Sequence, residues 1–128
     1  MEDARGNVGG GAYDAFREGT RLLETANPHA AAVALERARE LEPEKGSIRE
    51  ALGRAYYRSG RFGDAEAEFA KAVDLDPVND YAHFGLGLSL WRTGDRRGAR
   101  GHLKLAAAMR PDEESYRRAL AEVTEGDG

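Results

Sequence analysis

Apolar residues recur at intervals of three and four positions along most of this chain. In the most regular stretch, 46–79, one such run contains Leu52 and Tyr56, and a second contains Phe69 and Leu75. This spacing predicts two amphipathic helices. A Ser-Gly pair separates the two runs and a proline follows the second, as is usual where helices end. The stretch is therefore predicted to form a helix-turn-helix unit.

The same pattern occurs three times with a period of 34 residues, over 12–45, 46–79 and 80–113. Five columns stay in register across the three copies: Gly19, Gly53 and Gly87; Ala31, Ala65 and Ala99; Leu35, Phe69 and Leu103; Ala38, Ala72 and Ala106; and Pro43, Pro77 and Pro111. A repeat of this length is typical of stacked helical arrays. Glycine in the first column lowers helix propensity, and we expect it where the second helix of the unit approaches closely.

One further helix is predicted after the third repeat, over 112–124. Its apolar face consists of Tyr116, Ala119, Leu120 and Val123, and we expect it to cover the end of the array as a capping helix. Residues 1–11 and 125–128 lack periodic apolar residues and are predicted to be disordered tails. The sequence thus predicts a single all-α domain, 12–124, folded as a stack of three helix pairs and a capping helix.

These repeats resemble the tetratricopeptide repeat, whose 34-residue unit carries Leu-Gly and Tyr in its first helix, followed by Ala, Phe, Ala and a closing Pro. The second repeat matches at Leu52, Gly53, Tyr56, Gly60, Ala65, Phe69, Ala72 and Pro77. The third matches at Leu86, Gly87, Gly94, Ala99, Ala106 and Pro111, with Leu90 and Leu103 in place of aromatic residues. The family's early tryptophan is replaced by Ala15, Arg49 and His83. The resemblance implies a right-handed superhelical α-solenoid that serves as a general interaction scaffold.

In the resembled family, the first helices of successive repeats line a concave groove, and five places in each unit point into it. Carried over to this sequence, those places hold Tyr13, Phe16, Thr20, Leu23 and Glu24; Ser47, Glu50, Arg54, Tyr57 and Arg58; and Tyr81, Phe84, Leu88, Trp91 and Arg92. They include six of the ten aromatic residues of the chain, and the only tryptophan is one of these six. Exposed aromatic residues beside arginines are enriched at interfaces. We predict a partner-binding groove formed by Tyr13, Phe16, Arg54, Tyr57, Arg58, Tyr81, Phe84, Leu88, Trp91 and Arg92.

The third repeat supplies most of the aromatic surface of this predicted groove. Helical spacing places Tyr81, Phe84, Leu88 and Trp91 on one stripe. His83, Gly87 and Leu90 already supply the core face of that helix, so the stripe is interpreted as lacking a partner within the repeats. The alternative is a groove filled by the protein itself, through its terminal segment or a second copy.

Some members of the family bind a C-terminal carboxylate with a clamp of lysine, asparagine and arginine. The matching places in this sequence hold Phe16, Thr20, Ala51, Tyr81 and Gly85. The clamp is absent, so the resemblance does not imply binding of chaperone tails in that mode.

Charge changes this picture in one region. The net charge is −4, yet residues 80–111 carry six basic and two acidic residues. The overall balance argues against nucleic acid as the main partner. The second helix of repeat three nevertheless carries a basic set on its outer, convex side: Arg96, Arg97, Arg100 and Lys104. A solvated face, a contact with an acidic protein and an RNA contact all remain open for it.

Catalytic chemistry finds little support in the sequence. There is no phosphate-binding loop or nucleophile motif, and the three histidines, His29, His83 and His102, are predicted to be isolated, with His83 in a packing column. The acid pair Glu66/Glu68 is predicted to lie on a solvated helix face. There is no cysteine, which excludes disulfide and thiol chemistry. We predict no enzyme, no cofactor, no metal site and no membrane-spanning segment.

The expected function is a non-catalytic protein-protein interaction adaptor that binds a peptide segment or helix, including one with acidic groups, in its concave groove. Two alternatives remain open. One is a structural homo-oligomerisation module that uses the same groove, and the other is nucleic-acid binding through the basic third repeat. The lack of cysteine and of an N-terminal apolar core favours a cytoplasmic location. Small size and the predominance of arginine among the basic residues favour a bacterial source.

Overall fold

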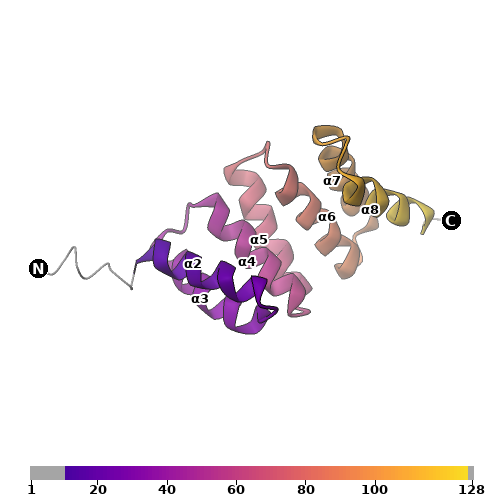
Figure 1. Ribbon diagram of the computed structural model, residues 1–128. Coiled ribbons are helices and arrows are strands. Elements are labelled where there is room, and N and C mark those ends of the chain that lie inside the picture. The colour runs from indigo at the N-terminus through magenta and orange to yellow at the C-terminus, as the bar shows by residue number, and fades with distance from the viewer. Residues whose placement is uncertain (1–10, 127–128) are drawn as a thin grey trace, which may run out of the picture.

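The structure is a computed structural model that describes residues 11–126. Seven helices and no strand occur within this range: α2 (Ala12–Glu24), α3 (Pro28–Leu41), α4 (Gly46–Arg58), α5 (Phe62–Leu75), α6 (Asp80–Thr93), α7 (Arg96–Met109) and α8 (Glu114–Glu125). They follow one another from α2 and α3 at one end of the molecule to α7 and α8 at the other (Figure 1). This arrangement confirms the predicted all-α stack of three helix pairs followed by a single helix.

The predicted ends of the domain fall partly outside the described residues. The predicted tails lie there except for Gly11, which precedes α2, and residues 125 and 126, which end α8 and follow it. The last helix runs over Glu114–Glu125, whereas the sequence placed it at 112–124. The division into one domain and two disordered tails stays a prediction.

The glycine column marks where the two helices of each repeat meet. A Cβ atom added to Gly53 would lie 2.9 Å from ring carbons of Phe69, and one added to Gly19 or Gly87 would lie 2.4 or 2.7 Å from Leu35 or Leu103. These separations are shorter than any side chain tolerates without displacement. The glycines therefore let a large side chain of the second helix rest on the backbone of the first.

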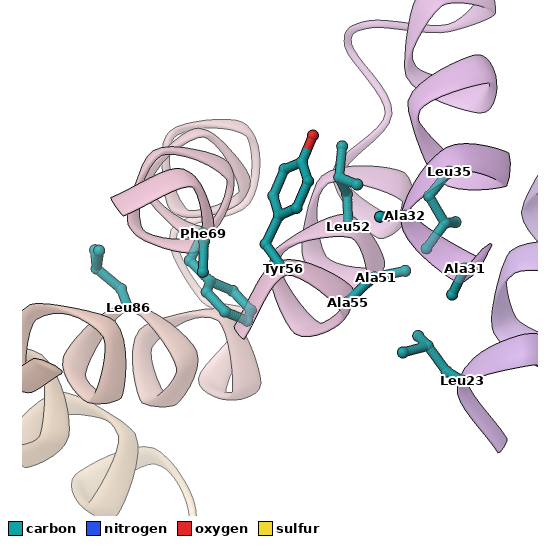
Figure 2. Packing of buried hydrophobic residues seen from close by; sticks show 11 residues of the cluster. Leu23, Ala31, Ala32, Leu35, Ala51, Leu52, Ala55, Tyr56, Phe69 and Leu86 are labelled. Carbon is teal, nitrogen blue, oxygen red and sulfur yellow. The ribbon is translucent and has the colours of Figure 1, made fainter. Parts of the chain in front are cut away.

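Phe69 also joins the second repeat to the third. A Cβ atom added to Gly85, on α6, would lie 2.4 Å from the Phe69 ring. The cluster that contains Phe69 continues from Leu23 on α2 to Leu86 on α6, as Figure 2 shows. Phe69 is only 2% exposed, so its ring fills the space between α4 and α6. Burial of a phenylalanine side chain contributes roughly 1.5–3 kcal/mol.

The turns within the repeats use left-handed backbone conformations. Gly60 and Gly94 adopt φ angles of 80° and 102° after α4 and α6, which glycine accommodates without steric cost. The first repeat lacks this glycine, and Ala26 adopts a φ angle of 60° in its turn. The turn geometry is thus kept where the glycine is missing, at a cost of about 1 kcal/mol for a residue with a Cβ atom.

Two tyrosine hydroxyls form hydrogen bonds between different helices. Tyr56 on α4 donates a hydrogen bond of 2.5 Å to Glu36 on α3, and Tyr116 on α8 donates one of 2.6 Å to Asp80 on α6. Burial, together with the bond to the carboxylate, raises the pKa of Tyr56 to about 12. Both hydroxyls therefore remain protonated donors at neutral pH.

The prediction of a solvated face for Glu66/Glu68 is wrong for Glu68. Its side chain is 7% exposed, and its two carboxylate oxygens accept hydrogen bonds from Arg39 on α3 at 2.5 Å and from Arg49 on α4 at 3.1 Å. Helical periodicity along α5 alone does not reveal this site, because two long arginine side chains reach over from neighbouring helices. Glu66 is only partly buried, and its carboxylate accepts a hydrogen bond of 2.8 Å from Thr93.

Candidate binding groove

The first helices of the repeats, α2, α4 and α6, lie next to one another and form a common face, here called the groove face. Two hollows open between α2 and α4. The first, here called the apolar cleft, has a volume of about 190 Å³ and is lined by Ala12, Tyr13, Phe16, Glu42, Lys45, Ser47 and Ile48. Tyr13 is 70% exposed at its edge. The predicted groove residues Tyr13 and Phe16 therefore share one hollow.

The second hollow, here called the arginine hollow, has a volume of about 360 Å³ and is lined by Thr20, Leu23, Glu24, Arg54 and Arg58. All five occupy places that the family resemblance assigned to the groove. Arg58 donates a hydrogen bond of 3.3 Å to the carbonyl oxygen of Leu23. The structure thus brings the two predicted arginines of repeat two against the end of α2.

Arg54 is less satisfied than its neighbour. Its Nε atom is buried and has no hydrogen-bond partner among the described residues, and its guanidinium carbon lies 5.8 Å from the centre of the Tyr81 ring. A buried N–H group without an acceptor is costly, commonly by about 1–3 kcal/mol. One donor of Arg54 therefore lacks an acceptor among the described residues.

A third group on this side of the molecule consists of two aromatic rings around the predicted groove residue Arg92. Its guanidinium carbon lies 5.6 Å from the ring centre of Tyr57 and 4.6 Å from that of Phe62, and these two rings meet edge to face at 5.0 Å. Sequence reasoning missed Phe62, because it considered only the first helix of each repeat. The signal available was an aromatic residue at the start of α5, directly after the turn that follows Arg58.

The aromatic stripe of the third repeat is partly covered by α8. The Phe84 ring centre lies 4.7 Å from that of Tyr116, and Leu88 and Trp91 pack against the cluster that contains Ala119 and Val123. The stripe, which the sequence interpretation left without a partner among the repeats, therefore does have a partner within the fold. Packing of the capping helix provides one, and a binding role for Phe84, Leu88 and Trp91 stays a prediction.

A sequence model of the tetratricopeptide repeat family matches residues 16–80 and again 50–114, and so covers most of the chain. The chain belongs to this family. No match was found among curated protein sequences.

Solved structures of tetratricopeptide repeat proteins share the fold. One is the first such domain of Spaghetti (RPAP3) bound to the HSP90 peptide SRMEEVD, with a TM-score of 0.85 at 16% identity, covering 90% of this chain and 91% of that one. Another is the Sgt2 domain from Aspergillus fumigatus, with a TM-score of 0.83 at 19% identity, covering 90% of this chain and 78% of that one. A third is the Yersinia enterocolitica type III secretion chaperone SycD in complex with a peptide of the translocator YopD, with a TM-score of 0.80 at 12% identity, covering 91% and 94%.

Two histidines of this tetratricopeptide repeat chain form a pair, so the prediction that they are isolated is wrong. Nδ1 of His83 lies 3.0 Å from Nδ1 of His102, and Nε2 of His83 lies 2.8 Å from the carbonyl oxygen of Pro77. A carbonyl only accepts, so His83 carries its proton on Nε2 and, when neutral, accepts from His102. The prediction that His83 takes a packing position is confirmed, since it is 5% exposed.

The histidine pair predicts a loss of stability in acid. Burial, with the nearby His83, lowers the pKa of His102, and Asp95 opposes this more weakly. The unfolded chain therefore binds a proton below about pH 6.5 that the folded chain resists, so the free energy of unfolding is highest above that pH and falls as pH decreases through the folded pKa. We expect the melting temperature to fall more steeply between pH 6.5 and 5 in the wild type than in a His102→Gln variant.

His29, which is exposed on α3, supplies the control for this measurement. A His29→Gln variant should keep the acid sensitivity of the wild type. If His102→Gln and His29→Gln behaved alike, the acid sensitivity would not originate in the pair.

The described residues contain no group of three or more histidine, cysteine, aspartate or glutamate side chains placed to hold a metal ion. Across the same residues, no helix has the length and apolar character needed to cross a membrane.

Proposed function

We propose that this chain is a non-catalytic adaptor that binds a peptide segment or helix along its groove face. The observation that carries the proposal is the pair of hollows between α2 and α4, which contains residues from the groove columns of two successive repeats. Two structures with the same fold, the RPAP3 domain and SycD, each hold a peptide. Their existence supports a peptide as the ligand of this face.

The residues divide into two roles in this proposal. Exposed and half-buried rings provide apolar contacts, chiefly Tyr13, Phe16, Tyr57 and Tyr81 on the groove face. Arg54, Arg58 and Arg92 pair with acidic groups of the bound segment, since a guanidinium binds carboxylates through its planar fork. Phe84, Leu88 and Trp91 extend the surface beside α8 and support that helix as well.

Capture of a C-terminal carboxylate at the family's clamp positions is not part of the proposal. Ala51 is 2% exposed, and Gly85 lies against the Phe69 ring with no side chain of its own. Neither position presents a polar group to a ligand.

The sequence alternatives fit the structure less well than an adaptor does. In the basic second helix of repeat three, the guanidinium of Arg96 lies 5.3 Å from the Trp91 ring centre and Arg100 is half-buried, so part of this set is engaged within the chain.

The adaptor is proposed to act in a bacterial cytoplasm, in agreement with the arginine-rich, cysteine-free composition. Sedimentation velocity separates it from a homo-oligomer, because a peptide-binding monomer keeps one sedimentation coefficient as its concentration rises.

Charge reversal tests the adaptor proposal directly. Peptides are selected from a displayed random library against the wild type, and their affinity is measured by fluorescence anisotropy. An Arg58→Glu/Arg92→Glu variant should bind them about tenfold more weakly or worse, because each charge-assisted hydrogen bond contributes roughly 1.5–3 kcal/mol. Arg97→Glu/Lys104→Glu, which changes two exposed residues of α7, should bind as the wild type does. Equal loss in both variants would place binding away from the groove face.

A further inference from the structure

We propose that the arginine hollow binds the carboxylate of a single acidic side chain in the captured segment, and that an apolar side chain of the same segment occupies the apolar cleft. This inference rests on the proposed function and specifies its ligand. The partner is an acidic peptide, recognised internally through a glutamate or aspartate side chain rather than through its C-terminus.

Arg54, Arg58 and Thr20 supply the side-chain donors of the residues that line the arginine hollow. Arg54 keeps a buried Nε–H without an acceptor among the described residues, and Arg58 uses Nη1 to donate to the Leu23 carbonyl. The hydroxyl of Thr20 already donates to the carbonyl oxygen of Arg17 at 3.1 Å. A ligand therefore has to be an acceptor, and two guanidinium groups one helical turn apart favour an anionic acceptor.

The charge of the hollow selects between anions. Arg54 and Arg58 contribute two positive charges and Glu24 contributes one negative charge to the same lining, so the hollow complements one negative charge. A carboxylate carries one, whereas a phosphoserine carries between about 1.5 and 2 at neutral pH. Glu24 would repel the second charge of the phosphate.

The two hollows also set a spacing. Phe16 in the apolar cleft and Leu23 in the arginine hollow are seven residues apart on α2, and Ser47 and Arg54 are seven apart on α4. Seven residues of helix rise about 10 Å. A helical ligand presents side chains at this separation seven residues apart on one face, and a polyproline II segment does so at three residues apart.

The experiment uses the peptides selected from a displayed random library against the wild-type chain of 128 residues. We expect the selected sequences to be enriched in glutamate or aspartate at a spacing of seven or three residues from an apolar residue. In one selected peptide, acidic→amide substitution at that position should weaken binding about tenfold or more. The same substitution should change the affinity of an Arg54→Gln or Arg58→Gln variant by less than about threefold, and Arg97→Gln should retain the wild-type response.

Glu24 provides a second, independent measurement. A peptide with phosphoserine in place of the acidic residue should bind the wild type more weakly than the acidic peptide does. In Glu24→Gln, the difference in affinity between the two peptides should become smaller or change sign. Because Glu24 is exposed, its substitution leaves the core intact. Arg58 is also exposed, so Arg58→Gln still tests the carboxylate site if Arg54→Gln impairs folding.

The outcomes separate the two proposals. Selected peptides without acidic enrichment, or with an affinity that is indifferent to the acidic→amide change, would overturn the carboxylate site and leave a peptide-binding groove. If the wild type bound the phosphopeptide more tightly than the acidic peptide, the inferred preference of the hollow for a singly charged group would be overturned. Failure to select any peptide that competes for the groove face would overturn both the site and the proposed function.

Discussion

Replacing Glu68 with glutamine is expected to lower the free energy of unfolding by about 3 kcal/mol, as for other broken buried ion pairs. The carboxylate is 7% exposed and holds guanidinium groups from two other helices, Arg39 and Arg49, at 2.5 and 3.1 Å. A neutral amide leaves both positive charges close together with their compensating charge removed. The expected cost lies at the low end of the known range, because the Arg39 side chain is 31% exposed and water can solvate it.

Urea denaturation followed by circular dichroism measures this change. Asp74→Asn is the matched control, since it removes an exposed carboxylate from the same helix and should alter stability by less than about 0.5 kcal/mol. Glu68→Ala/Arg49→Ala should recover part of the loss of Glu68→Ala alone, because one unpaired charge is removed with its partner. A cost below about 1 kcal/mol for Glu68→Gln would contradict a stabilising role for the buried pair.

The fold could be predicted from the sequence because the packing of a repeat array is local. Glycine at 53 and a large residue at 69 recur in the neighbouring units at a fixed separation, so each unit predicts how its two helices meet. The tetratricopeptide resemblance also assigned Thr20, Leu23, Glu24, Arg54 and Arg58 to one face, and the structure places them around one hollow.

The buried polar pairs were missed because each residue was judged by its own helix. Position four and position 23 of the repeats hold Ala15 and Ala34 in the first unit, Arg49 and Glu68 in the second, and His83 and His102 in the third. In the last two units these side chains contact one another. Reading the two columns together would have indicated a pair of matched chemistry across the helices.

The partner of the aromatic stripe could not be predicted from repeat periodicity. The capping helix has no second helix after it within the described residues, so its packing does not follow from the register of the complete units. Its Tyr116 meets Phe84 through the angle at which α8 lies on α6 and α7. That angle depends on the tertiary packing of α8 rather than on the spacing of its apolar residues.

Gly85→Ala is expected to lower the free energy of unfolding by about 1–2 kcal/mol, although alanine is the better helix former by about 1 kcal/mol. The added methyl group would lie 2.4 Å from the buried ring of Phe69, and Gly53 lies against the same ring. The ring therefore has no free space on the opposite side into which it could move. Gly101→Ala is the control: a Cβ atom there meets nothing within 4 Å, so alanine should stabilise the protein by up to about 1 kcal/mol.

The neighbouring repeats indicate how the damage can be reversed. Ala51 and Ala119 occupy the place of Gly85 at the neighbouring junctions, and they lie in core clusters with Leu35 and Leu103, which occupy the place of Phe69. Alanine is thus found with a leucine, and glycine with the phenylalanine. In a Phe69→Leu background, Gly85→Ala should therefore become neutral or stabilising, a coupling of about 1–3 kcal/mol in a double-mutant cycle. If Gly85→Ala cost as much with leucine as with phenylalanine, the aromatic ring would not be the group that requires glycine at this junction.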